Sequence, residues 1–126
     1  MNVLTIEPLE PVFSVCKVAD YTETETDFPF CFIGRTDQEK SLVCPVERVP
    51  ARTLAREDGW RAFRICGELD FSLVGILARI SEILASAGIG LFAVSTFNTD
   101  YVLTKAENFS RALSLLENAG YRIGNG

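Results

Sequence analysis

The 126-residue sequence contains no histidine. It therefore lacks the side chain that most often serves as a general base near neutral pH and as a nitrogen ligand for metal ions. Most familiar hydrolytic arrangements depend on such a base, so its absence argues against a hydrolase.

A surplus of positive charge and a long apolar run are also missing. The formal net charge is −5 and the sequence pI is near 4.7, so we expect no nucleic-acid partner, because phosphate contacts need a basic surface. The apolar stretch 71–97 is broken by Arg79 and Glu82, which would be costly inside a bilayer. The N-terminus has neither the basic start nor the apolar core of a signal peptide. The sequence thus predicts a cytoplasmic protein without a membrane segment.

The cysteines show no close pairing. Cys16, Cys31, Cys44 and Cys66 form no Cys-x-x-Cys motif, and each falls in a predicted strand. Redox pairs and thiolate metal sites usually need closer spacing. We therefore predict reduced thiols that act as small apolar core residues, with no metal and no cofactor.

The second half of the chain predicts the order β-α-β-β-α-β, which is the ferredoxin-like arrangement with both helices on one face of an antiparallel sheet. Apolar residues recur at helical spacing in two segments, and aromatic and β-branched residues mark the strands. Strands are expected at 60–65, 89–97, 101–104 and 121–123, and helices at 73–87 and after 104.

Capping residues set the expected helix boundaries. Ser72 is predicted as the N-cap of the first helix, with Phe71 and Ile76 forming a hydrophobic staple around it. This places Gly75 inside the helix, where glycine costs about 1 kcal/mol relative to alanine. A capping box from Thr104 to Glu107 is expected to open the second helix. Glycines end both helices, at Gly88 and Gly120.

The first half is rich in strands and shows no convincing long helix. Strands are predicted at 12–18, 29–36 and 41–44, with an exposed acidic loop at 21–27. A Thr-Asp pair follows a strand at Thr36 and again at Thr99, which suggests an internal duplication. We therefore predict an α+β fold of two ferredoxin-like domains, a helix-poor domain at 1–59 and a complete one at 60–126.

Two segments, "GWRAFRICGELDFSLVGILARI" and "GIGLFAVSTFNTDYVLTKAENFSRALSLLENAGY", resemble the small bacterial tandem ACT-domain proteins related to the cytosolic arginine sensors. The likeness extends into the first half through "FIGRTDQEKSLVCPVERVP". It implies two ACT domains, the first of them degenerate, and a non-catalytic regulatory protein that binds an amino acid. It also implies action on a separate protein or through a homodimer. Val74 departs from the usual ACT loop, which has proline before the glycine.

The resemblance places the ligand at the loop and helix start of the second ACT domain, near the interface with the first domain. Unpaired backbone N–H groups there would receive a carboxylate, and Gly75 would let the ligand come close. Asp100 would pair with the ammonium group, and Thr96 and Asn98 would add acceptors. The full predicted ligand set is Asp70, Phe71, Ser72, Leu73, Val74, Gly75, Ile76, Thr96, Phe97, Asn98 and Asp100.

Several alternatives stay open. Taken singly, Phe71, Leu73 and Val74 fit packing between helix and sheet better than ligand contact. Gly75 equally fits close helix–sheet packing, and Asp100 is a common turn residue. The chain could be a ligand-free ACT-type oligomerisation module, since open sheet edges attract partners. It could also be a small enzyme that uses a carboxylate with Arg79 or Arg35, although no base, nucleophile or metal set converges in the sequence. Arginine sensors of this family carry an acidic residue where this chain has Leu73, which favours a less polar ligand.

Overall fold

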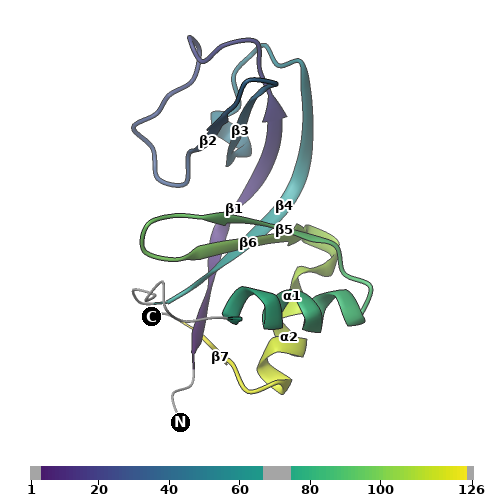
Figure 1. Ribbon diagram of the computed structural model, residues 1–126. Helices are drawn as coiled ribbons and strands as arrows, with labels where there is room; N and C mark the ends of the chain where they lie inside the picture. Colours follow the sequence, from purple (N-terminus) through teal and green to yellow (C-terminus); the bar gives the residue numbers. More distant parts are fainter. Residues whose placement is uncertain (1–3, 67–74, 125–126) are drawn as a thin grey trace. The chain divides into compact units, whose positions relative to one another are not determined.

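The computed structural model describes residues 4–66 and 75–124, and these residues form a mixed α+β structure that is dominated by strands (Figure 1). They divide into two compact units. The C-terminal unit comprises the described parts of Met1–Glu10 and Arg61–Gly126, and the N-terminal unit comprises Pro11–Trp60. The elements, in chain order, are β1 (Thr5–Lys17), β2 (Phe32–Arg35), β3 (Lys40–Pro45), the 3-10 helix η1 (Val46–Arg48), β4 (Ala55–Ile65), α1 (Ile76–Ser86), β5 (Leu91–Ser95), β6 (Asp100–Lys105), α2 (Ala106–Asn118) and β7 (Arg122–Ile123).

The C-terminal unit has the predicted order β4-α1-β5-β6-α2-β7. β5 and β6 form an antiparallel hairpin in which Leu91 lies opposite Thr104. Both helices lie on the same side of this hairpin (Figure 1). The start of β1 joins the unit by pairing in parallel with β7, so that Thr5 lies opposite Arg122. The described part of the second half thus folds together with residues 4–10, which the sequence places in the first domain, and the division at 59/60 into two domains stays a prediction.

The core of the C-terminal unit lies between its sheet and its two helices. Buried residues recur every three or four positions along each helix, which is the spacing of one helix face. This confirms, within the described residues, that each predicted helix has one apolar face. The buried members of this core are Ile6, Phe63, Ile65, Ile80, Leu84, Ile89, Val102, Phe109, Ala112 and Leu116.

The first helix begins three residues later than predicted. α1 starts at Ile76, and Gly75 is its N-cap with φ 85° and ψ 2°. This left-handed conformation suits glycine and ends the helix on its N-terminal side. The predictions of Ser72 as N-cap and of Gly75 inside the helix are therefore wrong, and so is the staple, because Ile76 is the first helical residue. Phe71 and Ser72 themselves lie outside the described residues.

The second helix begins without the predicted capping box. α2 starts at Ala106, and its N-cap is Lys105, which makes no side-chain capping hydrogen bond. β6 continues to Lys105 and buries Thr104 completely, and the Thr104 hydroxyl donates to the Lys105 carbonyl at 3.3 Å. The Thr104 side chain is thus used at the end of the strand and not as a cap.

The predicted helix ends are confirmed at both glycines. Gly88 and Gly120 have φ 75° and φ 108° and follow α1 and α2. After α1, the Ile89 N–H donates to the Leu84 carbonyl and the Gly88 N–H to the Ala85 carbonyl, which is the Schellman pattern. These bonds satisfy the last carbonyls of the helix.

The N-terminal unit contains strands, one 3-10 turn and no α-helix, which confirms the helix-poor prediction. β1 pairs antiparallel with β3, and β3 pairs antiparallel with β2. Its core contains Cys16 and Cys44 with Val18 and Leu42, and Cys31 packs partly against them. All four cysteines of the chain are free. Burial raises the pKa of the Cys44 thiol to about 12, as expected for a core cysteine.

The two hairpin turns share one hydrogen-bonding pattern. In the β2–β3 turn, the Thr36 N–H and hydroxyl both donate to the Glu39 carbonyl, at 2.9 and 3.3 Å. In the β5–β6 turn, the Thr96 N–H and hydroxyl donate to the Thr99 carbonyl at 2.8 and 2.9 Å. Thr36 therefore matches Thr96 and not Thr99, which corrects the alignment that the Thr-Asp pairs suggested. The duplication itself stays a prediction that this match supports.

Candidate functional site

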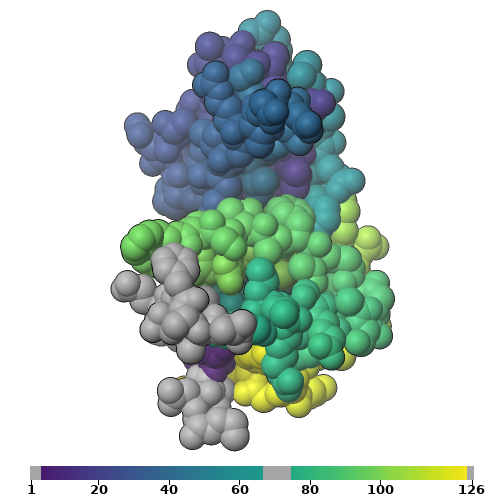
Figure 2. Space-filling model, in the orientation of Figure 1, coloured from purple at the N-terminus to yellow at the C-terminus, as the bar shows by residue number. Residues whose placement is uncertain are grey.

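The predicted ligand residues fall into three groups. Asp70, Phe71, Ser72, Leu73 and Val74 lie outside the described residues. Gly75 and Ile76 form the start of α1, and Thr96, Phe97, Asn98 and Asp100 belong to the β5–β6 turn and the strand that follows it. Both described groups lie in the C-terminal unit, whose surface includes the β5–β6 hairpin (Figure 2).

The start of α1 offers unused backbone donors. The first intrahelical hydrogen bond is donated by the Arg79 N–H to the carbonyl of the N-cap residue Gly75, at 2.9 Å. The N–H groups of Ile76, Leu77 and Ala78 precede this bond and have no carbonyl one turn earlier in the helix. The first turn of α1 carries no acidic side chain that would offset the positive end of the helix dipole. Such a helix end accepts an anion such as a carboxylate.

Gly75 is explained by backbone conformation. A Cβ atom built on Gly75 would meet no described atom within 4 Å, and the residue is exposed. Close packing of the helix on the sheet therefore does not account for this glycine. Its φ of 85° does, because an L side chain rarely adopts this region.

Thr99 fixes the β5–β6 turn to the end of β4. Its side chain is 8% exposed, and its hydroxyl donates to the Ile65 carbonyl at 2.7 Å. The turn is thereby held beside the last residues of β4, immediately before the segment 67–74. In the sequence, Thr99 is visible only as part of the Thr-Asp repeat, because nothing in the local pattern indicates that this threonine is buried.

The other turn residues differ in how available they are. Phe97 is 78% exposed and Asn98 is exposed, so both present their side chains at the turn. The Thr96 hydroxyl donates to the Thr99 carbonyl and its oxygen accepts the Thr99 N–H at 3.4 Å, so one lone pair of this oxygen is left as an acceptor. Asp100 is half-buried at the start of β6, opposite Ser95. The turn thus offers acceptor groups suited to an ammonium ion.

A charged network lies on the sheet around Arg64, and it includes Tyr101, the residue that follows Asp100 in β6. The Arg64 Nε donates to Glu7 Oε1 at 3.0 Å, and its Nη1 donates to the Tyr101 hydroxyl at 3.3 Å. The bond to Tyr101 and, after it, the bond and charge of Glu7 raise the pKa of Arg64, against the lowering effect of burial. Burial also raises the pKa of the Cys66 thiol. A reactive thiolate is therefore not favoured at Cys66.

The described residues form neither a candidate metal site nor a candidate membrane-spanning helix. Within 4–66 and 75–124, no three cysteine, aspartate or glutamate side chains gather in an arrangement that could hold a metal ion. In the same part of the chain, no helix is long and apolar enough to cross a membrane. Arg79 and Arg35, which the enzyme alternative invoked, are exposed on α1 and β2.

The strand and helix order of the C-terminal unit, with both helices on one side of the hairpin, defines a ferredoxin-like α+β unit. A family model described as "ACT domain" matches residues 55–118. The chain therefore belongs to the ACT domain family, as the resemblance indicated.

The comparisons also find individual relatives. The "Cytosolic arginine sensor for mTORC1 subunit 1" of Homo sapiens is 37% identical over 59 residues, which are 46% of this chain and 18% of that protein. The Bos taurus protein of the same name matches to the same extent. The chain thus covers less than a fifth of the length of these relatives.

Solved structures share the fold over nearly the whole chain. A protein from Agobacterium tumefaciens has a TM-score of 0.86 and 28% identity, with 98% of this chain and 94% of that chain covered. The aspartate kinase of Clostridium acetobutylicum, described as an allosteric enzyme, has a TM-score of 0.65 and 13% identity. That match covers 88% of this chain and 33% of the kinase, and at this identity it shows the fold alone.

Proposed function

We propose that this ACT-domain protein is a non-catalytic regulator that binds an amino acid at the start of α1 and the β5–β6 turn. Membership of the ACT family and the likeness to a protein named as an arginine sensor support the class of function. The observation that carries the site is the N-terminus of α1, where Gly75 caps the helix in a left-handed conformation and the first turn carries no acidic side chain.

The proposed ligand contacts follow from the two parts of the site, the start of α1 and the β5–β6 turn. The N–H groups of Ile76 and Leu77 would receive the α-carboxylate, and a helix dipole favours such an anion by about 0.3–1 kcal/mol at an exposed end. Asp100 would receive the ammonium group, together with acceptors from Thr96 and Asn98. Phe97 and the segment from Asp70 to Val74 would enclose the side chain of the ligand.

The proposed identity of the ligand depends on the residue at position 73, which is leucine. The resemblance places an acidic residue here in the arginine sensors, and leucine offers no charge to a guanidinium group. A less polar amino acid is therefore the proposed ligand. The protein would act in the cytoplasm, on a separate protein or through a homodimer, and its first half would be a degenerate second ACT domain.

A thermal-shift screen of the full chain against the twenty amino acids tests this proposal. A ligand present at a hundred times its dissociation constant stabilises the folded state by about 2.7 kcal/mol. The amide and the N-acetyl derivative of each hit serve as matched controls, because each lacks one of the two charges. We expect one or a few free amino acids to raise the melting temperature and their derivatives to have a smaller effect.

The competing functions give different results in the same assay. If none of the twenty amino acids raises the melting temperature of the folded chain, the protein is an oligomerisation module and the proposal fails. If an added amino acid is consumed during incubation, the protein is an enzyme and the non-catalytic proposal fails. Mass spectrometry of the recovered ligand separates binding from turnover.

A further inference from the structure

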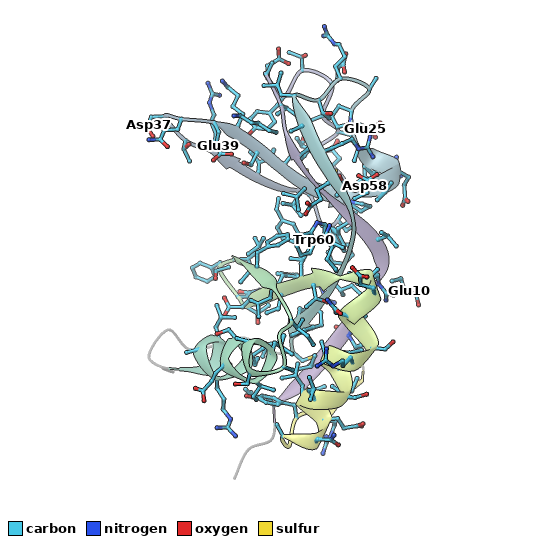
Figure 3. All side chains as sticks on the ribbon, turned by 90° about the vertical axis from the view of Figure 1, so that its right-hand side faces the viewer. Glu10, Glu25, Asp37, Glu39, Asp58 and Trp60 are labelled. Atoms are coloured by element: carbon cyan, nitrogen blue, oxygen red, sulfur yellow. The ribbon has the colours of Figure 1, made fainter. Side chains whose placement is uncertain are left out.

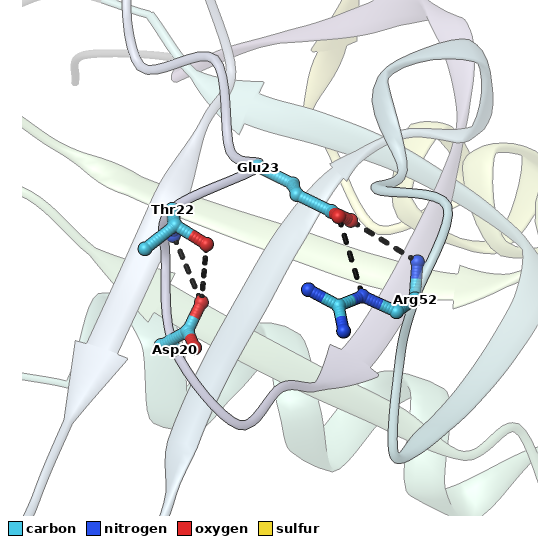
Figure 4. Close-up of polar contacts among 4 residues, drawn as sticks. All are labelled: Asp20, Thr22, Glu23 and Arg52. Atoms are coloured by element: carbon cyan, nitrogen blue, oxygen red, sulfur yellow. Dashed lines mark hydrogen bonds and ion pairs between the residues drawn. The ribbon is translucent and has the colours of Figure 1, made fainter.

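The N-terminal unit contains a pocket of about 510 Å³ that lies outside the site proposed above. This volume falls within the range of small-molecule sites. The pocket is formed where the loop after β1 faces the segment between η1 and β4, and Figure 4 shows Asp20 and Arg52 on these two facing segments. Its lining residues are Ala19, Asp20, Glu23, Pro50, Ala51, Arg52, Thr53 and Leu54.

Arg52 supplies a positive group to this pocket. Its backbone N–H and its Nε each donate to one oxygen of Glu23, both at 3.3 Å. These bonds hold the backbone and the Nε atom of Arg52 against Glu23. They leave the two terminal nitrogens of the guanidinium, Nη1 and Nη2, outside the ion pair. The side chain of Arg52 is 82% exposed. A planar guanidinium with two outward nitrogens matches the geometry of a carboxylate.

Asp20 supplies a negative group on the opposite wall. Its Oδ1 accepts the Thr22 N–H at 3.0 Å and the Thr22 hydroxyl at 2.7 Å. These bonds, and the nearby charges of Arg52 and Lys40, lower the pKa of Asp20, so the carboxylate is charged at neutral pH. Both bonds go to Oδ1, and Oδ2 accepts no bond from the residues that the structure describes.

The remaining wall is apolar. Ala19, Pro50 and Ala51 line it, and Leu54 exposes 64% of its surface. A large apolar side chain so exposed beside a pocket gains stability when a ligand covers it. The pocket therefore combines the guanidinium of Arg52, already paired with Glu23, the separate carboxylate of Asp20 and an apolar surface within a single unit.

We propose that this pocket is a second ligand site, which takes a small zwitterion with an apolar side chain. The carboxylate of the ligand lies at Arg52, its ammonium group at Asp20, and its side chain on Ala19, Pro50 and Leu54. The proposal shares its class of ligand with the proposed function but none of its residues. The Glu23–Arg52 pair serves to orient the guanidinium. An exposed ion pair of this kind contributes little to the stability of the fold.

Nuclear magnetic resonance of the ¹⁵N-labelled full chain tests the proposal residue by residue. L-leucine is the probe, and leucine amide and N-acetyl-leucine are the controls that lack the carboxylate and the free ammonium group. We expect leucine to shift the amide signals of Ala19, Asp20, Ala51 and Leu54. Each derivative should bind there about two- to fivefold more weakly, because the charged groups act at an exposed rim.

Matched variants assign the two charges. Asp20→Asn keeps an oxygen for the Thr22 bonds and removes the charge, and Arg52→Gln removes the guanidinium. Each should weaken leucine binding at this pocket about two- to fivefold. Arg56→Gln is the control, because Arg56 lies in the same unit, forms an exposed ion pair with Asp58 and does not line the pocket.

The location of the shifts separates this proposal from the proposed function. Shifts near Gly75 and Thr96 without shifts at the pocket overturn the second site and leave the first. Shifts at the pocket alone support the second site, and the thermal-shift screen of all twenty amino acids then tests the first. If the two derivatives shift the pocket signals with the affinity of leucine, or if leucine shifts nothing, the zwitterion site is overturned.

Discussion

The buried hydroxyl of Thr99 donates to the main-chain carbonyl of Ile65 over 2.7 Å. This bond ties the β5–β6 turn to the end of β4, although the two residues are far apart in the sequence. Thr96 and Asp100 flank Thr99 in the turn, so the bond positions the acceptor groups of the proposed site. It also gives the Ile65 carbonyl a side-chain donor in the core.

We predict that Thr99→Val destabilises the fold by about 1–3 kcal/mol, because it leaves the Ile65 carbonyl unsatisfied in a buried position. Thr99→Ser keeps the hydroxyl and should therefore lose less stability than Thr99→Val. Urea unfolding of the two variants measures the difference. Equal stability of Thr99→Val and Thr99→Ser would show that the hydrogen bond carries no net stabilisation.

The order of elements and both helix faces of the C-terminal unit could be predicted, because they follow from a periodicity that extends over ten or more residues. The helix starts could not. Ser72 and Thr104 have the side chains of good caps, but the backbone conformation at Gly75 and the length of β6 decide where the helices begin. Capping patterns are short, and the surrounding structure overrides them.

The site was predictable only in part. The sequence pointed to Gly75 and to the turn from Thr96 to Asp100, because glycine and turn residues are visible locally. It did not point to Thr99, whose burial depends on β4. The pocket with Asp20 and Arg52 lies between two loops, and no local sequence pattern predicts that these loops lie close together. For the acidic loop 21–27 the sequence predicts only exposure.

Gly75→Ala should destabilise the protein by about 1–2 kcal/mol, because alanine at φ 85° enters the left-handed region. Gly90→Ala is the matched control, since Gly90 has neither a positive φ nor a described atom within 4 Å of a built Cβ. Thermal unfolding monitored by circular dichroism compares them. If both variants lose the same stability, the conformation of Gly75 is not what requires a glycine.

Arg64 should couple energetically to Glu7, because the Nε–Oε1 distance is 3.0 Å and both side chains are mostly covered, at 32% and 22% exposure. A double-mutant cycle of Glu7→Gln and Arg64→Gln should give a coupling of about 0.5–1 kcal/mol. The same cycle in high salt should give less, because salt screens such pairs. Additive single effects would mean that the pair does not help to hold the first strand in the C-terminal unit.

Stability should fall at alkaline pH through Cys44. Its folded-state pKa of about 12 lies above the ordinary value of 9.0, so the fold favours the protonated thiol. The contribution is complete below pH 9 and is lost as the pH rises toward 12, with a slope of at most about 1.4 kcal/mol per pH unit. Cys44→Ala removes this dependence at some cost in packing. Denaturant unfolding of both proteins at several alkaline pH values should show a steeper decline for the unsubstituted chain, and parallel declines would contradict the assignment.

Asp100→Ala should weaken amino-acid binding by about 2–5 kcal/mol, because it leaves the ammonium group of the ligand without its charged partner. The fold should change little, since Asp100 is only half-buried at the start of β6. Isothermal titration calorimetry with the amino acid that the thermal screen identifies gives the affinity, and circular dichroism reports the fold.

Asp37→Ala is the control for this substitution. Asp37 is an exposed carboxylate on the β2–β3 turn of the N-terminal unit, as Figure 3 shows, and it belongs to no proposed ligand set. It should leave the affinity unchanged. Leu73→Glu, at a position outside the described residues, should move the preference toward arginine by restoring the acidic group implied by the resemblance. If Asp100→Ala binds as tightly as the unsubstituted chain while remaining folded, Asp100 is only a turn residue and the ammonium group must be bound elsewhere.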